Sequence, residues 1–249
     1  MKLQQLLSFT RKAVDEYQMI ETGDKIAVGI SGGKDSLTLL YALSGLRRFY
    51  PKPFELTAVT VDLGYEKFHT EKIDALCREL GVPYHVIKTD IAHILFEERK
   101  ESNPCSLCAK MRKGALNEAV KKLGYNKVAY AHHKDDIVET MILSLIFEGR
   151  FHSFSPKSYL DRMGLTVIRP MMFVNEADVI GFQRKYDLPV EKSRCPVDGL
   201  TKRQYAKELI HQLEIDHPGA KQRMFTAILN GRIDGWPVRL TREEVKSSS

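Results

Sequence analysis

The sequence predicts an α/β protein built on a doubly wound parallel sheet of five strands, with a small helical part at the C-terminus. Short apolar segments rich in β-branched residues alternate with longer segments of helical periodicity. Glycine, proline or aspartate separates most of these segments. Ligands bind at the carboxyl ends of the strands in such sheets, so functional residues are expected directly after the strand segments.

Composition and periodicity locate the individual elements. Short apolar runs of the kind found in buried parallel strands predict strands at 25–30, 55–61, 84–88, 127–131 and 166–170. Apolar spacing typical of helices predicts them at about 3–18, 37–48, 66–80, 106–123, 135–147 and 175–186. Residues 91–104 show no clear period and are expected to form an extended loop. The last fifty residues predict two or three helices and no strand.

This order of elements suggests three regions. We expect an N-terminal helix over 1–20, an α/β domain over 21–190 and a helical C-terminal region over 191–249. The hydrophobic fraction of 43% is typical of a globular protein. No apolar run approaches the roughly 20 residues that cross a membrane, and the first residues lack the apolar core of a signal peptide. A cytoplasmic protein with no membrane partner is therefore expected.

The charge distribution favours a polyanionic partner. The formal net charge is +6, and residues 99–127 contain eight Lys or Arg against two Asp or Glu. A solvated helix face gives the same bias, so charge alone leaves nucleic-acid binding open.

A glycine turn joins the first predicted strand to the helix after it. The turn reads Ser31-Gly-Gly-Lys-Asp-Ser36. Gly32 and Gly33 let the backbone N–H groups approach a ligand, while the hydroxyls and the helix N-terminus favour an anion. Lys34 adds a point charge suited to phosphate. The spacing is not that of a Walker A loop. A chance glycine turn before a helix is the alternative.

A carboxylate pair follows the fourth predicted strand, in Ala131-His-His-Lys-Asp-Asp136. Asp135 and Asp136 there could hold Mg²⁺ against the phosphates of a nucleotide, or one of them could only cap the next helix. Asp62, at the end of the second strand, could reach a ribose or a base, or stabilise its turn. His132 and His133 are candidates for a direct role, with satisfied core histidines as the alternative.

Four cysteines are distributed unevenly along the chain. Cys105 and Cys108 form a Cys-x-x-Cys at the start of a basic helix, which suits a zinc half-site, a redox disulfide or an iron–sulfur half-site. Cys195 lies in a loop without a core pattern and is the better third ligand. Cys77 lies on the apolar face of a helix and is expected to be buried. Three thiolates describe either an incomplete zinc site or a cluster with one open iron.

The motifs together resemble the PP-loop ATP pyrophosphatase family, and within it the enzymes that thiolate tRNA at C2 of a pyrimidine. The match is most specific to the tRNA-cytidine 2-sulfurtransferase group and covers about residues 20–215. Extra zinc-binding cysteine pairs of the related thiouridine enzymes are absent from the sequence, which favours the cytidine branch. Ala131 stands where many relatives have glycine. The motifs that carry the resemblance are Ser31–Ser36, Cys105-x-x-Cys108, Ala131–Asp136, Arg169-Pro170 and Cys195.

The resemblance implies an adenylating tRNA thiolase that uses ATP, Mg²⁺ and a [4Fe-4S] cluster. The loop from Ser31 through Gly32, Gly33, Lys34 and Asp35 to Ser36 would bind ATP phosphates, with Asp62, Ala131, His132 and Asp136 also near the nucleotide. Cys105, Cys108 and Cys195 would ligate iron. Asp135 or Asp136 would organise Mg²⁺ and the reacting base. Lys34 and Arg112 complete the candidate catalytic set, because Arg112 falls where related enzymes carry a basic catalytic residue.

The implied reaction transfers AMP to the C2 oxygen of the base, after which sulfur attacks C2 and displaces AMP. The partners would be tRNA and a sulfur donor, either sulfide or a cysteine desulfurase. The sequence leaves open a homodimer, and it also leaves open cysteine persulfide or disulfide chemistry in place of a cluster. Aromatic and basic residues interspersed over 147–162 could stack RNA bases or could be core.

Three other functions fit parts of the sequence. The first two are 2-thiouridine formation and an ATP-dependent thiolation or amidation of a small molecule on the same fold. The third is a non-catalytic iron–sulfur or zinc protein that binds RNA, against which the intact phosphate loop and the carboxylate pair argue.

Overall fold

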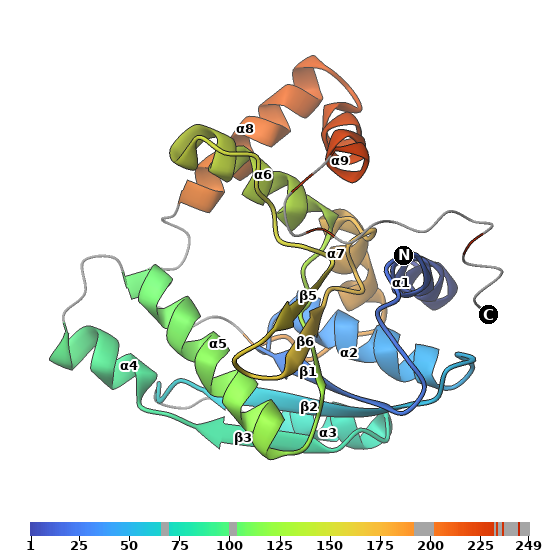
Figure 1. The fold of residues 1–249 in the computed structure, drawn as a ribbon, viewed down its shortest axis with the longest axis vertical. Coiled ribbons are helices and arrows are strands. Elements are labelled where there is room, and N and C mark those ends of the chain that lie inside the picture. The colour runs from blue at the N-terminus through green and yellow to red at the C-terminus, as the bar shows by residue number, and fades with distance from the viewer. Residues whose placement is uncertain are drawn as a thin grey trace.

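The computed structural model describes residues 1–65, 70–99, 104–191, 202–231, 233, 236 and 244, with only the backbone described for 104 and 105. Six strands form one sheet in the order β3-β2-β1-β4-β6-β5 (Figure 1). Their bounds are β1 Asp24–Ile30, β2 Phe54–Asp62, β3 Tyr84–Lys88, β4 Lys127–Ala129, β5 Lys157–Leu160 and β6 Leu165–Ile168.

The strand order reverses between β1 and β4, which creates the ligand-binding position of the sheet. The chain proceeds from β1 outward to β2 and β3, then returns to place β4 on the other side of β1. All five predicted strands are present and parallel, so the predicted doubly wound fold is confirmed. The crevice beyond the carboxyl ends of β1 and β4 is where such folds bind ligands.

The predicted number of strands was one too low. The sixth strand, β5, pairs antiparallel with β6 at the edge of the sheet. Its sequence, Lys157-Ser-Tyr-Leu160, is half polar, and Tyr159 is exposed. A strand of four residues on a sheet edge buries too little to show the apolar run by which the other strands were recognised.

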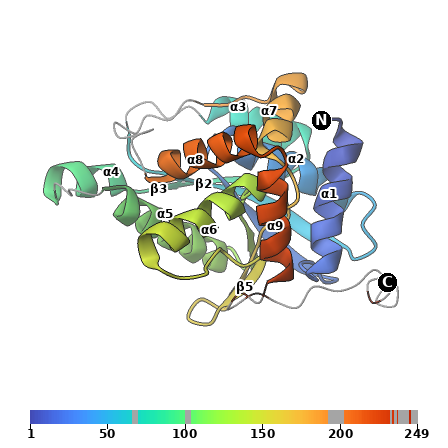
Figure 2. The same cartoon turned by 90° about the horizontal axis from the view of Figure 1, so that it is seen from above.

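Helices cover both faces of the sheet. The bounds on one face are α1 Leu3–Glu16, α2 Lys34–Arg47, α3 Glu71–Glu79 and α7 Glu176–Lys185, and α5 Pro104–Lys122 crosses the other face (Figure 1). Helices α6 Lys134–Glu148, α8 Lys202–Asp216 and α9 Ala220–Asn230 pack on one another. Seen from above, α8 and α9 lie over α6 (Figure 2). No helix in the described ranges is long and apolar enough to cross a membrane.

For residues 91–98 the expectation of an extended loop was wrong, while residues 100–103 of that range lie outside the described residues. A short helix, α4 Ile91–His93, continues into the π-helix η1 Ile94–Glu98. Ile91 and Leu95 are buried and lie four residues apart, a helical spacing that is too brief to register as a period. The wider turn of a π-helix also shifts later side chains away from the 3.6-residue pattern.

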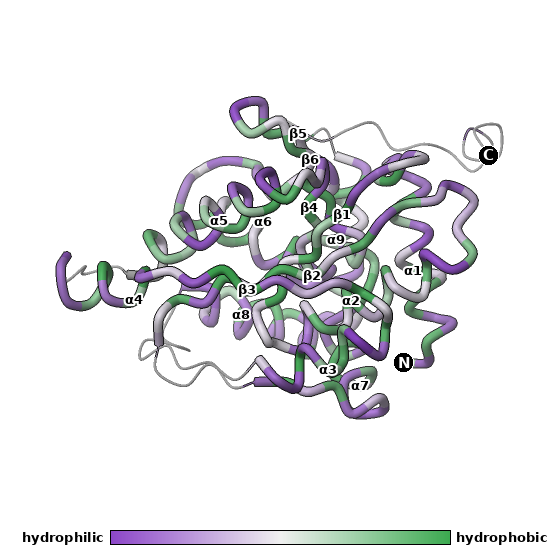
Figure 3. The backbone as a smooth tube through the Cα atoms, turned by 90° about the horizontal axis from the view of Figure 1, so that it is seen from below, coloured by the Kyte–Doolittle hydropathy of each residue, from purple (hydrophilic) through white to green (hydrophobic). Residues whose placement is uncertain are grey.

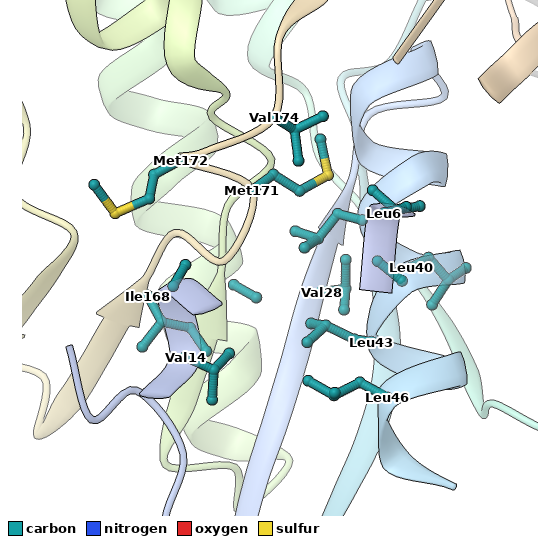
Figure 4. Close-up of a cluster of buried hydrophobic side chains, with 14 of the residues drawn as sticks. Leu6, Val14, Val28, Leu40, Leu43, Leu46, Ile168, Met171, Met172 and Val174 are labelled. Carbon is teal, nitrogen blue, oxygen red and sulfur yellow. The ribbon is translucent and has the colours of Figure 1, made fainter. Parts of the chain in front are cut away.

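The main core joins the N-terminal helix to the sheet. Leu6 and Val14 of α1 pack with Val28 of β1 and with the apolar side of α2, including Leu40 and Leu43 (Figure 4). Hydrophobic segments run through the strands, whereas the outer loops are mostly hydrophilic (Figure 3). A smaller cluster, which includes Ala27, Val59 and Leu116, seals α5 against the other face. Helix α2, which follows the predicted phosphate loop, is therefore packed against both α1 and the sheet.

A buried ion pair holds β4 beside β1. Lys127 of β4 places its Nζ 2.5 Å from Asp24 Oδ2 and 2.9 Å from the carbonyl oxygen of Met19, with both charged side chains almost fully buried. Asn126 also donates to Asp24 Oδ1 at 2.8 Å. These contacts hold β1 and β4 side by side, and the carboxyl ends of these two strands form the crevice.

We expect Lys127→Met to lower the free energy of unfolding by about 3 kcal/mol, because it leaves the Asp24 carboxylate buried without its cation. The matched control is Lys25→Met, which removes an exposed pair with Glu55 and should cost at most about 0.5 kcal/mol. Urea denaturation measures both. Equal losses in the two variants would contradict the role given to the buried pair.

Candidate functional site

The predicted phosphate loop follows β1 as a tight turn. Gly32 has a φ of 81°, a left-handed conformation that glycine adopts without strain. Ser36 Oγ donates to the carbonyl oxygen of Gly33 at 2.9 Å and accepts from the backbone N–H of Ser31 at 3.2 Å. Ser31 Oγ in turn accepts from the N–H of Gly33 at 3.3 Å. The two serines therefore stabilise the loop through internal hydrogen bonds, and their contact with phosphate stays a prediction.

The start of α2 combines a helix N-terminus with a lysine, which are features that suit an anion. The N-cap residue, Gly33, has no side chain to accept the first backbone N–H groups of the helix. Lys34 Nζ lies 3.1 Å from Asp35 Oδ2 and 3.2 Å from Glu176 Oε1. Burial alone would lower the pKa of Lys34, but these two carboxylates outweigh it and raise that pKa. Lys34 is therefore charged at neutral pH.

Asp35 faces the N-terminus of α6 across the crevice. Its Oδ1 is buried and accepts no hydrogen bond from the described residues, and it lies 3.7 Å from His133 Nε2. His133 Nδ1 accepts from the backbone N–H of Asp136 at 3.4 Å, so the imidazole carries its proton on Nε2 when it is neutral. A buried carboxylate oxygen without a donor is the kind of group that a bound cation satisfies.

Asp136 closes the first turn of α6. Its Oδ2 accepts from the backbone N–H of His133 at 2.9 Å, and its Oδ1 lies 3.1 Å from Arg203 of α8. The same guanidinium lies 3.3 Å from the buried Glu139. Burial and the neighbouring charge of Asp136 raise the pKa of Glu139. Asp136 therefore combines a capping role with a position directly on the crevice.

Asp135 uses both carboxylate oxygens for protein contacts. Oδ2 accepts from the backbone N–H of Glu176 at 2.7 Å, at the start of α7, and Oδ1 accepts from Lys221 of α9 at 2.5 Å. Burial would raise the pKa of Asp135, but the hydrogen bonds from Lys221 and Glu176 lower it. The arrangement ties α6, α7 and α9 together.

Several residues of the site were not predicted from sequence. Glu176 bridges Lys34 to Lys207, whose Nζ lies 2.6 Å from its Oε2. Arg203, Lys207 and Lys221 all come from α8 and α9 and each meets a carboxylate at the crevice. Glu176 could have been noticed as an acidic residue at the start of a predicted helix. The three cations carry no local signal, because they are ordinary positions in polar helices.

A second group of predicted residues lies at the ends of β4 and β6. His132 stacks on Phe154 with ring centroids 4.3 Å apart, and its Nδ1 accepts from Arg169 Nε at 3.1 Å. Burial, followed by the charge of Arg169, holds the pKa of His132 well below its ordinary value, so the ring is neutral at pH 7. Ala131 beside it is half-buried.

Asp62 lies in a turn at the end of β2. Its Oδ1 accepts from the backbone N–H of Gly64 at 3.0 Å, and its carbonyl oxygen accepts from Thr89 at the end of β3. The contacts seen at Asp62 are therefore those of the turn-stabilising alternative.

The cysteines are described in part. Cys105 and Cys108 begin α5, three residues apart and so on one side of the helix, and Cys108 is partly exposed. The side chain of Cys105 and the whole of Cys195 lie outside the described residues. Cys77 is fully buried in the core, as predicted, and burial raises the pKa of its thiol to about 12. Arg112 is exposed on α5.

Three of the predicted aromatic residues are not core. Phe147 and Phe151 follow one another around the end of α6, and Tyr159 lies on β5; Phe151 is 72% and Tyr159 is 62% exposed. Lys202 lies over the ring of Phe147 at 4.6 Å. These exposed rings favour the stacking interpretation over the core interpretation for this segment.

The arrangement suits a nucleotide with a divalent cation. The loop offers backbone N–H groups and Lys34 to phosphate, while the orphaned Asp35 Oδ1 and the crevice position of Asp136 offer oxygens to Mg²⁺. In the described residues, no cluster of three His, Cys, Asp or Glu side chains forms a metal site. The thiolate donors that the sequence assigns to a cluster suit iron by their chemistry.

Comparisons with known proteins agree with this geometry. The profile of the PP-loop domain matches residues 4–203. A tRNA-cytidine(32) 2-sulfurtransferase of Geobacter sulfurreducens is 41% identical over 222 residues, which are 88% of this chain and 86% of that protein. Among solved structures, the U34-tRNA thiolase NcsA of Methanococcus maripaludis, with its [4Fe-4S] cluster, gives a TM-score of 0.71 at 26% identity, over 89% of this chain and 76% of that one.

The NH3-dependent NAD synthetase of Campylobacter jejuni shares the fold alone, with a TM-score of 0.52 and 13% identity over 92% of this chain and 93% of that one.

We expect Asp135→Asn to lower the free energy of unfolding at pH 7 by about 2 kcal/mol, because Lys221 and the start of α7 lose a charged acceptor. The pKa of Asp135 is lower in the folded protein than its ordinary value of 3.8. Its stabilisation is therefore complete above pH about 4 and disappears as the pH falls through the folded pKa.

Urea titrations between pH 3 and pH 7 measure this effect, with the exposed Asp161→Asn as control. The difference between wild type and Asp135→Asn should shrink at the acidic end, and Asp161→Asn should match wild type throughout. A difference that stays constant down to pH 3 would contradict the charge-based role.

Proposed function

Because the chain belongs to the PP-loop family that includes the tRNA-cytidine(32) 2-sulfurtransferases, we propose that it is an ATP-dependent tRNA thiolation enzyme that forms 2-thiocytidine in the anticodon loop. The observation that carries this proposal is the meeting of the phosphate loop and the N-terminus of α6 at the β1–β4 crevice. Lys34, Asp35, His133 and Asp136 converge there from two elements.

The first half of the reaction adenylates the base. The C2 oxygen of the cytosine attacks the α-phosphorus of ATP, and pyrophosphate leaves. Lys34 and the backbone N–H groups at the start of α2 stabilise the negative charge that develops on the departing phosphates. Mg²⁺, when held by Asp136 and Asp35, supplies further charge neutralisation at the phosphate oxygens.

The second half replaces oxygen by sulfur. A sulfur nucleophile attacks C2, and AMP leaves with the original oxygen. When bound by Cys105, Cys108 and Cys195, a [4Fe-4S] cluster supplies an open iron position for that sulfur. The Cys-x-x-Cys spacing at the start of α5 supports this proposal, because residues three positions apart lie on the same side of a helix. Sulfide or a cysteine desulfurase is the proposed donor.

The RNA must present its target base unstacked. A loop nucleotide can be splayed out and stacked on aromatic side chains, which suits the exposed Phe147, Phe151 and Tyr159. Lys202 beside Phe147 adds a cation for the backbone. Since the proposed substrate is tRNA, we place the reaction in the cytoplasm.

The direct test is pyrophosphate release from ATP and Mg²⁺ with and without tRNA. We expect release that depends on tRNA, and a fall of about 10²–10³-fold for Lys34→Met, because a preorganised charge beside the leaving group is lost. Lys25→Met is the matched control, since it removes an exposed lysine of β1 that lies outside the loop and should keep wild-type activity. Release that is indifferent to tRNA, or a Lys34→Met variant of wild-type rate, would contradict the proposal.

A further inference from the structure

Arg169 is a buried cation that takes no part in the proposed adenylation or sulfur-transfer steps. It is the first residue after β6 and only 7% exposed. Its Nε donates to His132 Nδ1 at 3.1 Å, its Nη1 donates to the carbonyl oxygen of Ser155, and its guanidinium lies 5.0 Å from the centre of the Phe154 ring. Among the described residues, no carboxylate lies within 4.0 Å of it. Its hydrogen bonds and ring contact with the described residues are therefore all with neutral groups.

Two donors next to this cation lack a partner. Arg169 Nη2 makes no hydrogen bond with the described residues. His132 must accept at Nδ1, because the arginine Nε–H can only donate, and its own proton is thus on Nε2. That N–H is likewise unpaired among the residues the structure describes. Nε and Nη1 therefore anchor the guanidinium, while Nη2 and the His132 Nε2–H have no partner among the described residues.

A second cation, Lys113 of α5, acts electrostatically on Arg169 and His132. Lys113 is exposed, and its pKa is lowered by burial of part of the side chain and by the charge of Arg169. Its charge also acts on His132. Like charges that gather without a carboxylate cost free energy, and a bound anion would recover it. The contrast with the β1–β4 crevice is clear, because Asp135, Asp136 and Glu176 there each have a cation.

We propose that Arg169, His132 and Lys113 form a binding site for a backbone phosphate of the RNA substrate. This inference rests on the proposed function. A guanidinium fork and an imidazole N–H match the oxygens of a phosphodiester, and the lysine adds a point charge. We assign this site to RNA and not to ATP, because β4 lies between β6, which carries Arg169, and β1, which carries the phosphate loop. The half-buried Phe154 and Tyr130 flank it with aromatic surface of the kind that RNA contacts.

The experiment measures binding of tRNA without ATP over a series of salt concentrations, and binding of ATP with Mg²⁺ without tRNA. The variants are Lys113→Ala and Arg169→Lys. The matched control is Lys121→Ala, an exposed lysine two turns further along α5. We expect about ten-fold weaker tRNA binding for each variant. The slope of log K against log salt should become shallower by about 0.7 for Lys113→Ala. The control and all affinities for ATP should be unchanged.

The other outcomes would overturn either the phosphate site or the proposed function. Wild type that binds tRNA while both variants bind it equally well would overturn the phosphate site alone. Variants that lose ATP but keep tRNA would assign the anion to the nucleotide. Wild type that binds no tRNA would overturn the proposed function together with this site. Because Lys113 is exposed, Lys113→Ala should fold normally. It therefore tests the phosphate site even if Arg169→Lys does not fold.

Discussion

The crevice between β1 and β4 depends on a balance of buried charge. Four carboxylates, those of Asp35, Asp135, Asp136 and Glu176, converge where the N-termini of α2, α6 and α7 meet. Helix N-termini favour such anions, but burial so close together would be costly without cations. Lys34 supplies one from the loop itself, and α8 and α9 supply the others. The C-terminal helices are thus part of the site.

The carboxyl edge of the sheet divides into two halves that differ in how their charges are paired. The half at β1 and β4 gathers carboxylates and a phosphate loop, which suits a nucleotide that arrives with Mg²⁺. The half at β6 and α5 gathers Arg169 and Lys113 without a carboxylate among the described residues, which suits a substrate with bare phosphates. His132 and His133 are adjacent in sequence and connect the halves, one on each side. Such a division would bring ATP and RNA together at one edge of the sheet. Lys34 would bind the phosphates of ATP, and Arg169 and Lys113 would bind a phosphate of the RNA.

The features predicted correctly from sequence are those whose residues lie close together along the chain. The phosphate loop, the five parallel strands and the Asp135–Asp136 pair each lie within one short segment with its own signal. The ion pairs of Arg203 and Lys221 could not be predicted, because they join residues 67 and 86 positions apart. The same holds for Glu176, which meets Lys34 only after α7 has packed on α2. Strand β5 and the π-helix η1 were missed because each is too short to establish a period.

The most direct measurement is nucleoside mass analysis of tRNA after incubation with the anaerobically reconstituted protein, ATP, Mg²⁺ and sulfide. We expect a cytidine whose mass has increased by the exchange of one oxygen for one sulfur, formed by wild type and Cys77→Ala but not by Cys195→Ala. Cys77 is the matched control because it is buried in the core, away from α5. Unmodified cytidine with wild type, or a thiolated product that persists in Cys195→Ala, would contradict it.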